Sequence, residues 1–404
     1  MADLFSNNTT HDFATAALSI RDPHTRSDQL KRDAMNTGLL RNPAIQRLLT
    51  WQTGLPHTNQ TLPLRHPLEN LATSSVAIVL GLLACQQGLQ GEWGWLIRCL
   101  LIVIGWAHIL HALRCLRLPN RHAAAHGHLT GKAKVDRWTG QALSAILLAA
   151  PMSGYISSHV KDPSKAHHNW KTLMTPGEST YEEIKAMGFQ PGVPNEANWG
   201  HLRGLLVSPR YYWQALANGL HDAFCKGSIG ERAFNATIWC VILVIGLMNH
   251  ELSVFLVAYC VPRLLYEGCQ VLRVLVEHTF NEPGLPRTLA SYTRMTSAII
   301  LADPVPVIAD DVYQPERYLQ WLNWAFKMLI HFVVRCYIVT GDIGNHSSHH
   351  LRPGASFINH ESERMKLINE GHPICSNWGL VAAIDAFFTS LSKQPADLFT
   401  RNQE

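Results

Sequence analysis

The stretches LATSSVAIVLGLLACQQGL (residues 71–89) and WLIRCLLIVIGWAHILHAL (residues 95–113) are apolar along almost their whole length. Each has about the 20 residues that an α-helix needs to cross a bilayer. The few residues between them include Gln90, Gly91 and Glu92, so the connection is very short. The two stretches are therefore predicted to form a tight transmembrane hairpin.

A second apolar pair, residues 233–248 and 252–272, is joined by Asn249, His250 and Glu251. Neither of the two outer turns holds Lys or Arg, whereas several basic residues follow the first hairpin. They are Arg114, Arg117, Arg121, Lys132, Lys134 and Arg137. The positive-inside rule then places both chain ends and the long loops in the cytosol. We expect an all-α membrane protein in a bacterial inner membrane or its endoplasmic reticulum equivalent, with two hairpins of about four spanning helices under a cytosolic helical domain.

Residues 140–157 and 321–340 are also apolar, but each lies between histidine clusters that must share one side of the membrane. Lys327, His331 and Arg335 recur every four residues and form one polar stripe, which is typical of a helix in the interface plane. We interpret both stretches as interfacial or re-entrant, with full spanning pairs as the alternative. The chain then divides into a cytosolic N-terminal arm (1–70), a membrane domain (71–355) and a cytosolic C-terminal segment (356–404).

The composition agrees with a membrane protein, since 47 % of the 404 residues are hydrophobic and only 16 % are charged. The formal net charge is +4, and no cluster of Lys and Arg predicts a nucleic-acid partner. Nine Cys occur without a CxxC pair, which argues against a disulfide framework or a cysteine-based zinc site. The informative excess is the 22 histidines.

Histidines occur in clusters at spacings that bring imidazoles together. His122 and His126 are four residues apart, so a helix would place both on one face. The HxxHH triplet of His346, His349 and His350 is predicted to converge on one side of its helix in the same way. Between these clusters lie His159, His167 and His168, and His278 follows the fourth span directly. Isolated histidines such as His250 and His372 are better explained as surface or hydrogen-bonded residues.

Imidazole binds iron, copper, nickel and zinc, so the residue type alone does not select the metal. Nine histidines exceed what one tetrahedral zinc needs, and they suit two metals with positions left open for oxygen. The sequence has no HExxH helix and no ExxH pair of the kind that carboxylate di-iron bundles use. It also has no Walker loop and no GxGxxG, so nucleotide chemistry is not supported.

This pattern resembles the integral-membrane fatty acid desaturase and alkane hydroxylase superfamily, in which HxxxH, HxxHH and HxxHH boxes surround two spanning hairpins. The likeness covers roughly residues 70–355. It implies nine iron ligands: His122, His126, His159, His167, His168, His278, His346, His349 and His350. Seven residues separate His159 from His167, where the superfamily has two or three, so His128 or His201 could replace His159.

The resemblance implies a di-iron centre that uses O2 and external electrons to oxidise an unactivated C–H bond. The expected partners are a membrane lipid or fatty acyl substrate and a separate electron donor of the ferredoxin, rubredoxin or cytochrome b5 type with its reductase. Carboxylates normally orient such imidazoles through their second nitrogen. By their position in the sequence, Glu277, Asp311 and Asp342 are the candidates for this role.

Desaturation of an acyl chain is the expected reaction, because acyl chains are the commonest substrates of the superfamily. Hydroxylation and oxidative decarboxylation to a terminal alkene would need much the same iron site, and the Glu277-His278 context is similar to the alkane hydroxylases. A His-rich metal transporter or a haem protein is the alternative outside the enzymes. In both of those classes, the functional histidines should lie within the spans themselves.

Overall fold

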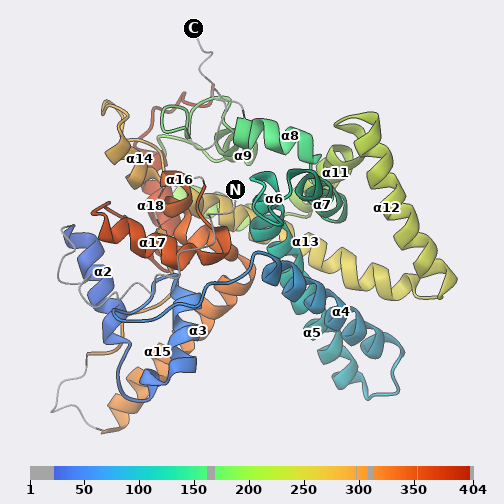
Figure 1. The fold of residues 1–404 in the computed structure, drawn as a ribbon, viewed down its shortest axis with the longest axis horizontal. Helices are drawn as coiled ribbons and strands as arrows, with labels where there is room; N and C mark the ends of the chain where they lie inside the picture. Colours follow the sequence, from blue (N-terminus) through green and yellow to red (C-terminus); the bar gives the residue numbers. More distant parts are fainter. Residues whose placement is uncertain (1–21, 162–168, 297, 308–313, 353, 401–404) are drawn as a thin grey trace.

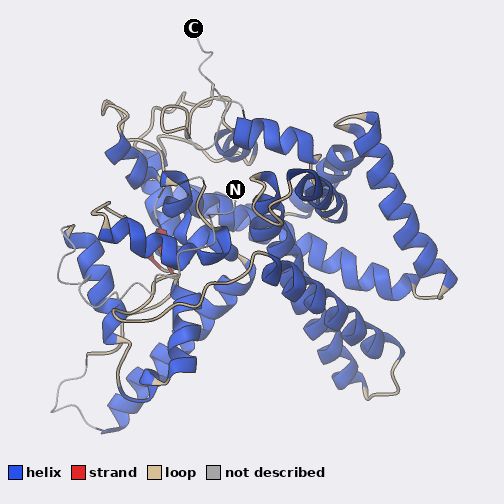
Figure 2. Cartoon of the chain, viewed as in Figure 1, coloured by secondary structure: helices blue, strands red, loops and turns tan. Residues whose placement is uncertain are grey.

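The computed structural model describes residues 22–161, 169–296, 298–307, 314–352 and 354–400. The described chain is mostly helical, with long loops and very little strand (Figures 1 and 2). Its longer helices are α2 (Pro23–Ala34), α3 (Pro43–Thr53), α4 (Leu68–Gln90), α5 (Trp95–Cys115), α7 (Ala133–Ile146), α10 (Asn195–Leu206), α11 (Pro209–Cys225), α12 (Ile229–Met248), α13 (Leu252–Glu277), α15 (Gln314–Tyr337), α17 (His360–Asn369) and α18 (Leu380–Ser392). The shorter ones are α6 (His122–Ala125), α8 (Met152–Ile156), α9 (Ser179–Ala186), α14 (Leu289–Met295) and α16 (His346–Leu351).

The expectation of an all-α chain is correct except for one short sheet. Strand β1 (Ala298–Ile300) pairs in parallel with β2 (Ser376–Trp378), and Ile299 lies opposite Asn377. Within the described ranges this pair is the whole of the sheet structure. Its strands have only three residues each, too few for the periodicity of a strand to stand out in the sequence.

Four helices are long and apolar enough to cross a membrane, as predicted: α4, α5, α12 and α13. Large apolar side chains such as Leu83 on α4, Leu100 on α5 and Val244 on α12 are exposed on them. Apolar surface of this kind needs lipid or another protein to cover it. The chain is therefore a membrane protein by the length and composition of these helices.

The first two apolar helices lie alongside each other and are joined by only four residues, 91–94 (Figure 1). Their contact depends on glycine, because a Cβ on Gly81 would lie 2.6 Å from Ile109 Cγ1 and 2.9 Å from the Gly105 carbonyl oxygen. Small residues at helix contacts let the backbones approach closely, which is how helices commonly pack in membranes.

The second pair differs, because α12 and α13 meet near their connecting turn and then diverge (Figure 1). Helix α12 packs instead against α7. There, the Gln141 side-chain amide donates a hydrogen bond of 2.8 Å from Nε2 to Asn235 Oδ1. The Trp239 indole donates to the Ala145 carbonyl oxygen at 2.9 Å. Residues 140–157, expected to be interfacial or re-entrant, do not form one helix, because the chain breaks between α7 and α8, where Leu148 has a φ of 49°.

Helix α15 carries the predicted polar stripe, of which His331 and Arg335 face protein while Lys327 is exposed. Lys327 and His331 both approach Asp303, and Arg335 donates to the Trp51 carbonyl oxygen. The opposite face exposes large apolar side chains, namely Leu319, Leu322, Phe326, Leu329, Ile330 and Val333. After α15 the chain bends by 118° into the segment that carries the HxxHH triplet.

The N-terminal helices share a core with distant parts of the chain. Met35, Leu49 and Leu55 pack with Ile300 and Trp324, among others. The described part of residues 1–70 is therefore joined to β1 and α15 by buried apolar contacts. The division of the chain into an arm, a membrane domain and a C-terminal segment stays a prediction.

Candidate metal centre

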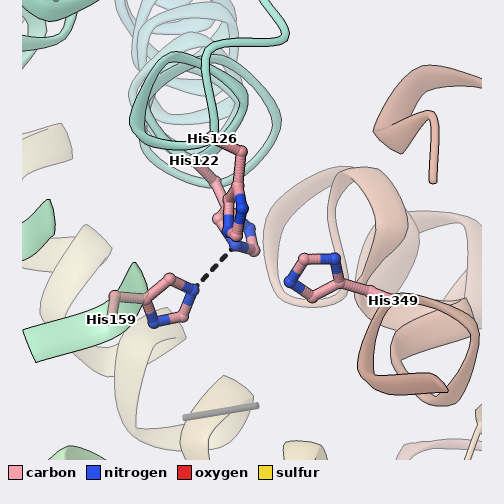
Figure 3. Close-up of side chains that lie close together, drawn as sticks. All are labelled: His122, His126, His159 and His349. Atoms are coloured by element: carbon pink, nitrogen blue, oxygen red, sulfur yellow. Dashed lines mark hydrogen bonds between the residues drawn. The ribbon is translucent and has the colours of Figure 1, made fainter. Parts of the chain in front are cut away.

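Four histidines from three distant segments form the first group. The ligand atoms of His122, His126, His159 and His349 all lie within 4.8 Å of one another. His122 Nε2 is 2.9 Å from His159 Nε2, and Figure 3 shows the rings of His159 and His349 approaching the pair from α6 from two sides. His122, His159 and His349 are buried, whereas His126 is half-buried.

Three buried histidines form the second group. The ligand atoms of His278, His346 and His350 also lie within 4.8 Å of one another. His346 Nε2 is 3.2 Å from His278 Nε2 and 2.9 Å from His350 Nε2. The residue that follows α13 thus meets a helix that begins 68 positions later in the chain.

The HxxHH triplet is divided between the two groups. His346 and His350 contribute to the second group and His349 to the first, a division that the spacing did not predict, while the centroids of the three rings lie within 6.1 Å of one another. Residues four apart share a helix face, whereas His349 is turned by about 100° from its neighbour His350. Because one short helix supplies both groups, the groups are adjacent, with 5.9 Å between the ring centroids of His349 and His350.

Two π-helical segments set the position of the first group. One, Leu116–Arg121, lies between α5 and α6 and contains Pro119, whose ring is incompatible with ordinary α-helical hydrogen bonding. Asn120 Nδ2 donates to the Cys115 carbonyl oxygen in this segment. The other, Ser157–Lys161, carries His159 itself. Single π turns inside helices occur often at functional sites.

Gly341 connects the segment of the HxxHH triplet to that of the HxxxH pair. Its φ is 62°, and a Cβ there would lie 3.1 Å from Pro119 Cδ. Glycine is favoured here for two reasons: it adopts the left-handed conformation without strain, and it has no Cβ to press on the proline ring. The segment leading to α16 can therefore pack directly against the π turn that precedes His122.

The two groups fit metal ions. Two nitrogens bound at about 2.1 Å to one ion and at right angles would be about 3.0 Å apart, close to the Nε2 separations of 2.9, 3.2 and 2.9 Å. A hydrogen bond can join two neutral imidazoles at such a distance, but His346 Nε2 faces two other Nε2 atoms, and one bound cation would accept lone pairs from all three rings. Each group can thus hold a metal ion, and imidazole donors suit iron, copper, nickel or zinc.

Aromatic residues that the sequence did not indicate surround the histidines. The Tyr292 hydroxyl lies 2.6 Å from His350 Nδ1, on the ring edge away from the second group, and burial raises the pKa of this phenol. Tyr155 stacks on His159 with 4.9 Å between the ring centroids. Phe357 packs against His122 and His349 at 4.6 and 4.5 Å. Tyr292 and His350 are 58 residues apart, so no local spacing marks their contact, whereas Tyr155 lies only four residues before His159 and could have been noticed from the spacing.

The predicted carboxylates differ in their surroundings. Glu277 is buried and forms an ion pair with Arg273 one turn earlier in α13. Asp342 is 1 % exposed, and among the described residues neither of its carboxylate oxygens has a hydrogen-bond partner. Asp311 lies outside the described residues, as do the predicted ligands His167 and His168.

The two proposed replacements for His159 are not part of either group. His128 lies beside the first group, with its ring centroid 6.0 Å from that of His126, and burial lowers its pKa. His201 Nε2 contacts the Met187 carbonyl oxygen at 2.8 Å, and its ring packs edge-on against Phe189. His159 itself lies within the first group.

Comparison with known proteins identifies no relative: no family model, curated protein or solved structure matches the chain. The functional argument therefore depends on the geometry of the two histidine groups and on the four apolar helices.

Proposed function

We propose that this chain is a membrane-bound non-haem di-iron oxidoreductase that oxidises an unactivated C–H bond of a fatty acyl or similar aliphatic chain. The observation that carries the proposal is the pair of adjacent, all-imidazole groups that share helix α16. Two adjacent metal ions with positions left open could together bind O2 and take up the electrons needed to attack an inert C–H bond. Together with external electrons, bound irons would supply the activation of O2.

The position of the histidines favours this function over a transporter or a haem protein. The HxxxH pair follows α5 through a π turn, and His278 is the residue directly after α13. The continuous apolar helix Trp95–Ala125 has 31 residues, more than the roughly 20 that a span needs, so His122 at its end can lie outside the membrane, as can His278 after α13. An ion path or a haem in the membrane would instead take histidines from within the spans.

The chain's own residues orient and shield the imidazoles. Tyr292 can accept a hydrogen bond from His350 Nδ1, which leaves Nε2 of that ring unprotonated and directed toward its group. Phe357 covers the rings of His122, His126 and His349 with an apolar surface. Excluding water from this side of the site limits side reactions of an oxidant.

The membrane supports an aliphatic substrate. An acyl chain dissolved in the bilayer could reach groups held just beyond α5 and α13 without crossing water. In this proposal both chain ends lie in the cytosol, and the exposed Lys132, Lys134 and Arg137 dock an acidic ferredoxin, rubredoxin or cytochrome b5.

Within this class, desaturation is the proposed reaction, hydroxylation the second candidate and oxidative decarboxylation the third. Metal analysis of the purified chain should find about two irons and no haem absorbance. The reaction is then followed by mass spectrometry after reconstitution with ferredoxin and its reductase under labelled oxygen. An unlabelled product lighter by one H2 means desaturation, label retained in the product means hydroxylation, and a terminal alkene shorter by one carbon means decarboxylation. Stoichiometric zinc, or haem, would refute the proposal.

A further inference from the structure

A cavity of about 240 Å³ lies beside the first histidine group. It is bordered by α3, by the start of α4, by the end of α5 and by the end of α15. By this measure a single water needs only about 10–15 Å³, so the cavity has room for a polar group of several atoms. Its lining includes the cations Arg65 and Arg335 and one carboxylate, Glu69, which already accepts a hydrogen bond from the His66 backbone N–H.

Arg335 is the most deeply buried charge in this lining, with 2 % of its surface exposed. Its Nε donates to the Trp51 carbonyl oxygen, and Nη1 donates to the Val339 carbonyl oxygen. Nη2 lies 3.4 Å from His360 Nε2. A guanidinium has five N–H donors, and among the described residues no carboxylate lies within ion-pair distance of this one. A buried cation is costly without an anion.

The hydrogen bonds of Asn345 fix which nitrogen of His360 carries the proton. Asn345 Oδ1 accepts from Arg364 Nη1 at 3.0 Å, and Nδ2 donates to the Gly54 carbonyl oxygen at 2.8 Å. The amide cannot be turned over, because Arg364 is a donor only. The second hydrogen of Nδ2 therefore points to His360 Nδ1, 2.8 Å away, and makes that atom an acceptor. Burial and the nearby arginines hold the pKa of His360 well below its ordinary value, so the neutral ring carries its proton on Nε2.

Arg335 Nη2 and His360 Nε2 are thus two donors turned toward each other, and neither can accept from the other. The nearest carboxylate is Glu361, whose Oε1 is 3.6 Å from His360 Nε2 and whose Oε2 is held by Arg65 at 2.6 Å. The Thr340 hydroxyl lines the same cavity, is buried, and has no hydrogen-bond partner among the described residues. Arg335 and Thr340 therefore lack an acceptor of negative charge, and His360 has only the distant Glu361 oxygen, whose carboxylate is already paired with Arg65.

Phe357 separates this cavity from the metal centre. One side of its ring packs on His122, His126 and His349, and the residue also lines the cavity. A molecule with its head in the cavity would therefore lie one aromatic ring away from the first histidine group, which is the right neighbourhood for the head of a substrate.

We propose that Arg335 and His360 bind the carboxylate of the substrate in this cavity, so that the enzyme acts on free fatty acids in preference to alkanes or esters. The identity of the occupant as substrate rests on the proposed function. The guanidinium would donate to the carboxylate oxygens and the His360 Nε2–H would donate to one of them, which satisfies the donors that lack an acceptor. The cavity has room for one carboxylate head group. The alkyl chain of the fatty acid would then pass toward Phe357.

Binding is measured with the purified full chain, metal-loaded, without O2 or reductant so that no turnover occurs. The probe is dodecanoate with a ¹³C-labelled carboxyl, followed by NMR titration and compared with methyl dodecanoate, dodecane and dodecyl phosphate. In Arg335→Gln the affinity for dodecanoate should fall about ten- to a hundred-fold, the usual range for a lost hydrogen bond to a charged group. Arg335→Lys keeps the positive charge but not the planar pair of guanidinium donors, so its affinity for dodecanoate should fall by a smaller factor. This variant provides the test if Arg335→Gln does not fold.

The matched control is Arg32→Gln. Arg32 is also fully buried and also bonded to neutral acceptors, the Leu55 carbonyl oxygen and Gln46 among them, but it does not line the cavity. This variant should bind dodecanoate like the wild type. The proposal is overturned if Arg335→Gln binds dodecanoate as tightly as the wild type, or if methyl dodecanoate binds equally well. Tighter binding of dodecyl phosphate would also overturn it and assign the site to a phosphate head group.

The same measurements separate this site from the proposed function. Arg335-dependent binding of dodecanoate in a chain that holds no iron would keep the carboxylate site and refute the oxidase. If wild type and Arg335→Gln oxidise dodecane and dodecanoate equally well, the carboxylate site is refuted. The proposed oxidoreductase function is then retained.

Discussion

His122 and His159 bring their Nε2 atoms to within 2.9 Å of each other, although 37 residues separate them in the chain. One follows an apolar helix through a π turn and the other lies within a second π turn. The contact explains how a histidine with an irregular spacing in the sequence can still join the first group.

The two histidine groups should lose metal independently. His349 belongs to the first group and its neighbour His350 to the second. We expect His349→Ala and His350→Ala each to keep about half of the bound iron and to lose oxidation of the substrate entirely. Elemental analysis and turnover assays of the two purified variants check this. Replacing His201, which contacts Met187, should leave the iron content unchanged. Loss of all iron, or of none, in both variants would contradict two separate sites.

Removing the Tyr292 hydroxyl should weaken the metal held by His350. The hydroxyl lies 2.6 Å from His350 Nδ1, and partners of this kind typically contribute 10- to 100-fold to metal affinity or activity. Tyr292→Phe should therefore lower iron affinity at one of the two sites by about that factor, measured by competition with a chelator. The control is Tyr181→Phe, which removes a buried hydroxyl bonded to the Leu398 carbonyl oxygen. Equal affinities in the two variants would argue against a role for Tyr292.

His360 should make the protein less stable in acid. Its pKa in the folded chain lies well below the ordinary value of 6.5, first because of burial and then because of Arg335, Arg65 and Arg364. The unfolded chain therefore takes up a proton near pH 6.5 that the folded chain refuses, and stability is lost as the pH falls below that value. The melting temperature of His360→Gln minus that of the wild type should therefore be more positive at pH 5 than at pH 8. His221→Gln, at an exposed position, controls for the loss of one histidine. A difference that is the same at both pH values would show that folding does not lower the pKa of His360.

Gly341→Ala should disturb the metal centre as well as the stability of the chain. Alanine at a φ of 62° costs about 1–2 kcal/mol in any surroundings, and here its Cβ would also press on Pro119 at 3.1 Å. Gly131 has a φ of 72° with open space around it, so Gly131→Ala carries the backbone cost alone. We expect both variants to melt earlier but only Gly341→Ala to lose iron. Similar iron contents would mean that the contact with Pro119 does not position α16.

The sequence predicted the apolar helices well because a spanning helix is a local property. Their ends were less accurate, and the reasons are specific. Helix α12 begins at Ile229, four residues before the predicted start, because Ser228 and Glu231 form a capping box. Helix α13 continues to Glu277 because its last turns bury polar side chains such as Arg273 inside the protein. The divergence of α12 from α13 follows from tertiary contacts with α7, which no hydropathy profile contains.

Of the candidate site, the sequence indicated which histidines matter but not how they divide. Spacing predicted that His346, His349 and His350 converge, and their rings do lie together, but it did not show that His349 joins the first group. The contacts of Tyr292 and Phe357 could not be foreseen, since both come from segments without a recognisable motif. The predicted polar stripe on α15 exists, but Asp303 contacts His331 and the Trp51 backbone contacts Arg335, which only the folded chain reveals.

The π turn at Leu116–Arg121 makes the direction of two imidazoles depend on chain length at a single point. Each residue of a helix adds about 100° of rotation, so removing one residue there would swing His122 and His126 away from His159 by more than a quarter of a turn. A one-codon deletion in this stretch would therefore abolish the first metal group while every histidine is still present. Engineered shortening of the segment between Cys115 and His122 should thus be more damaging than most point substitutions within it.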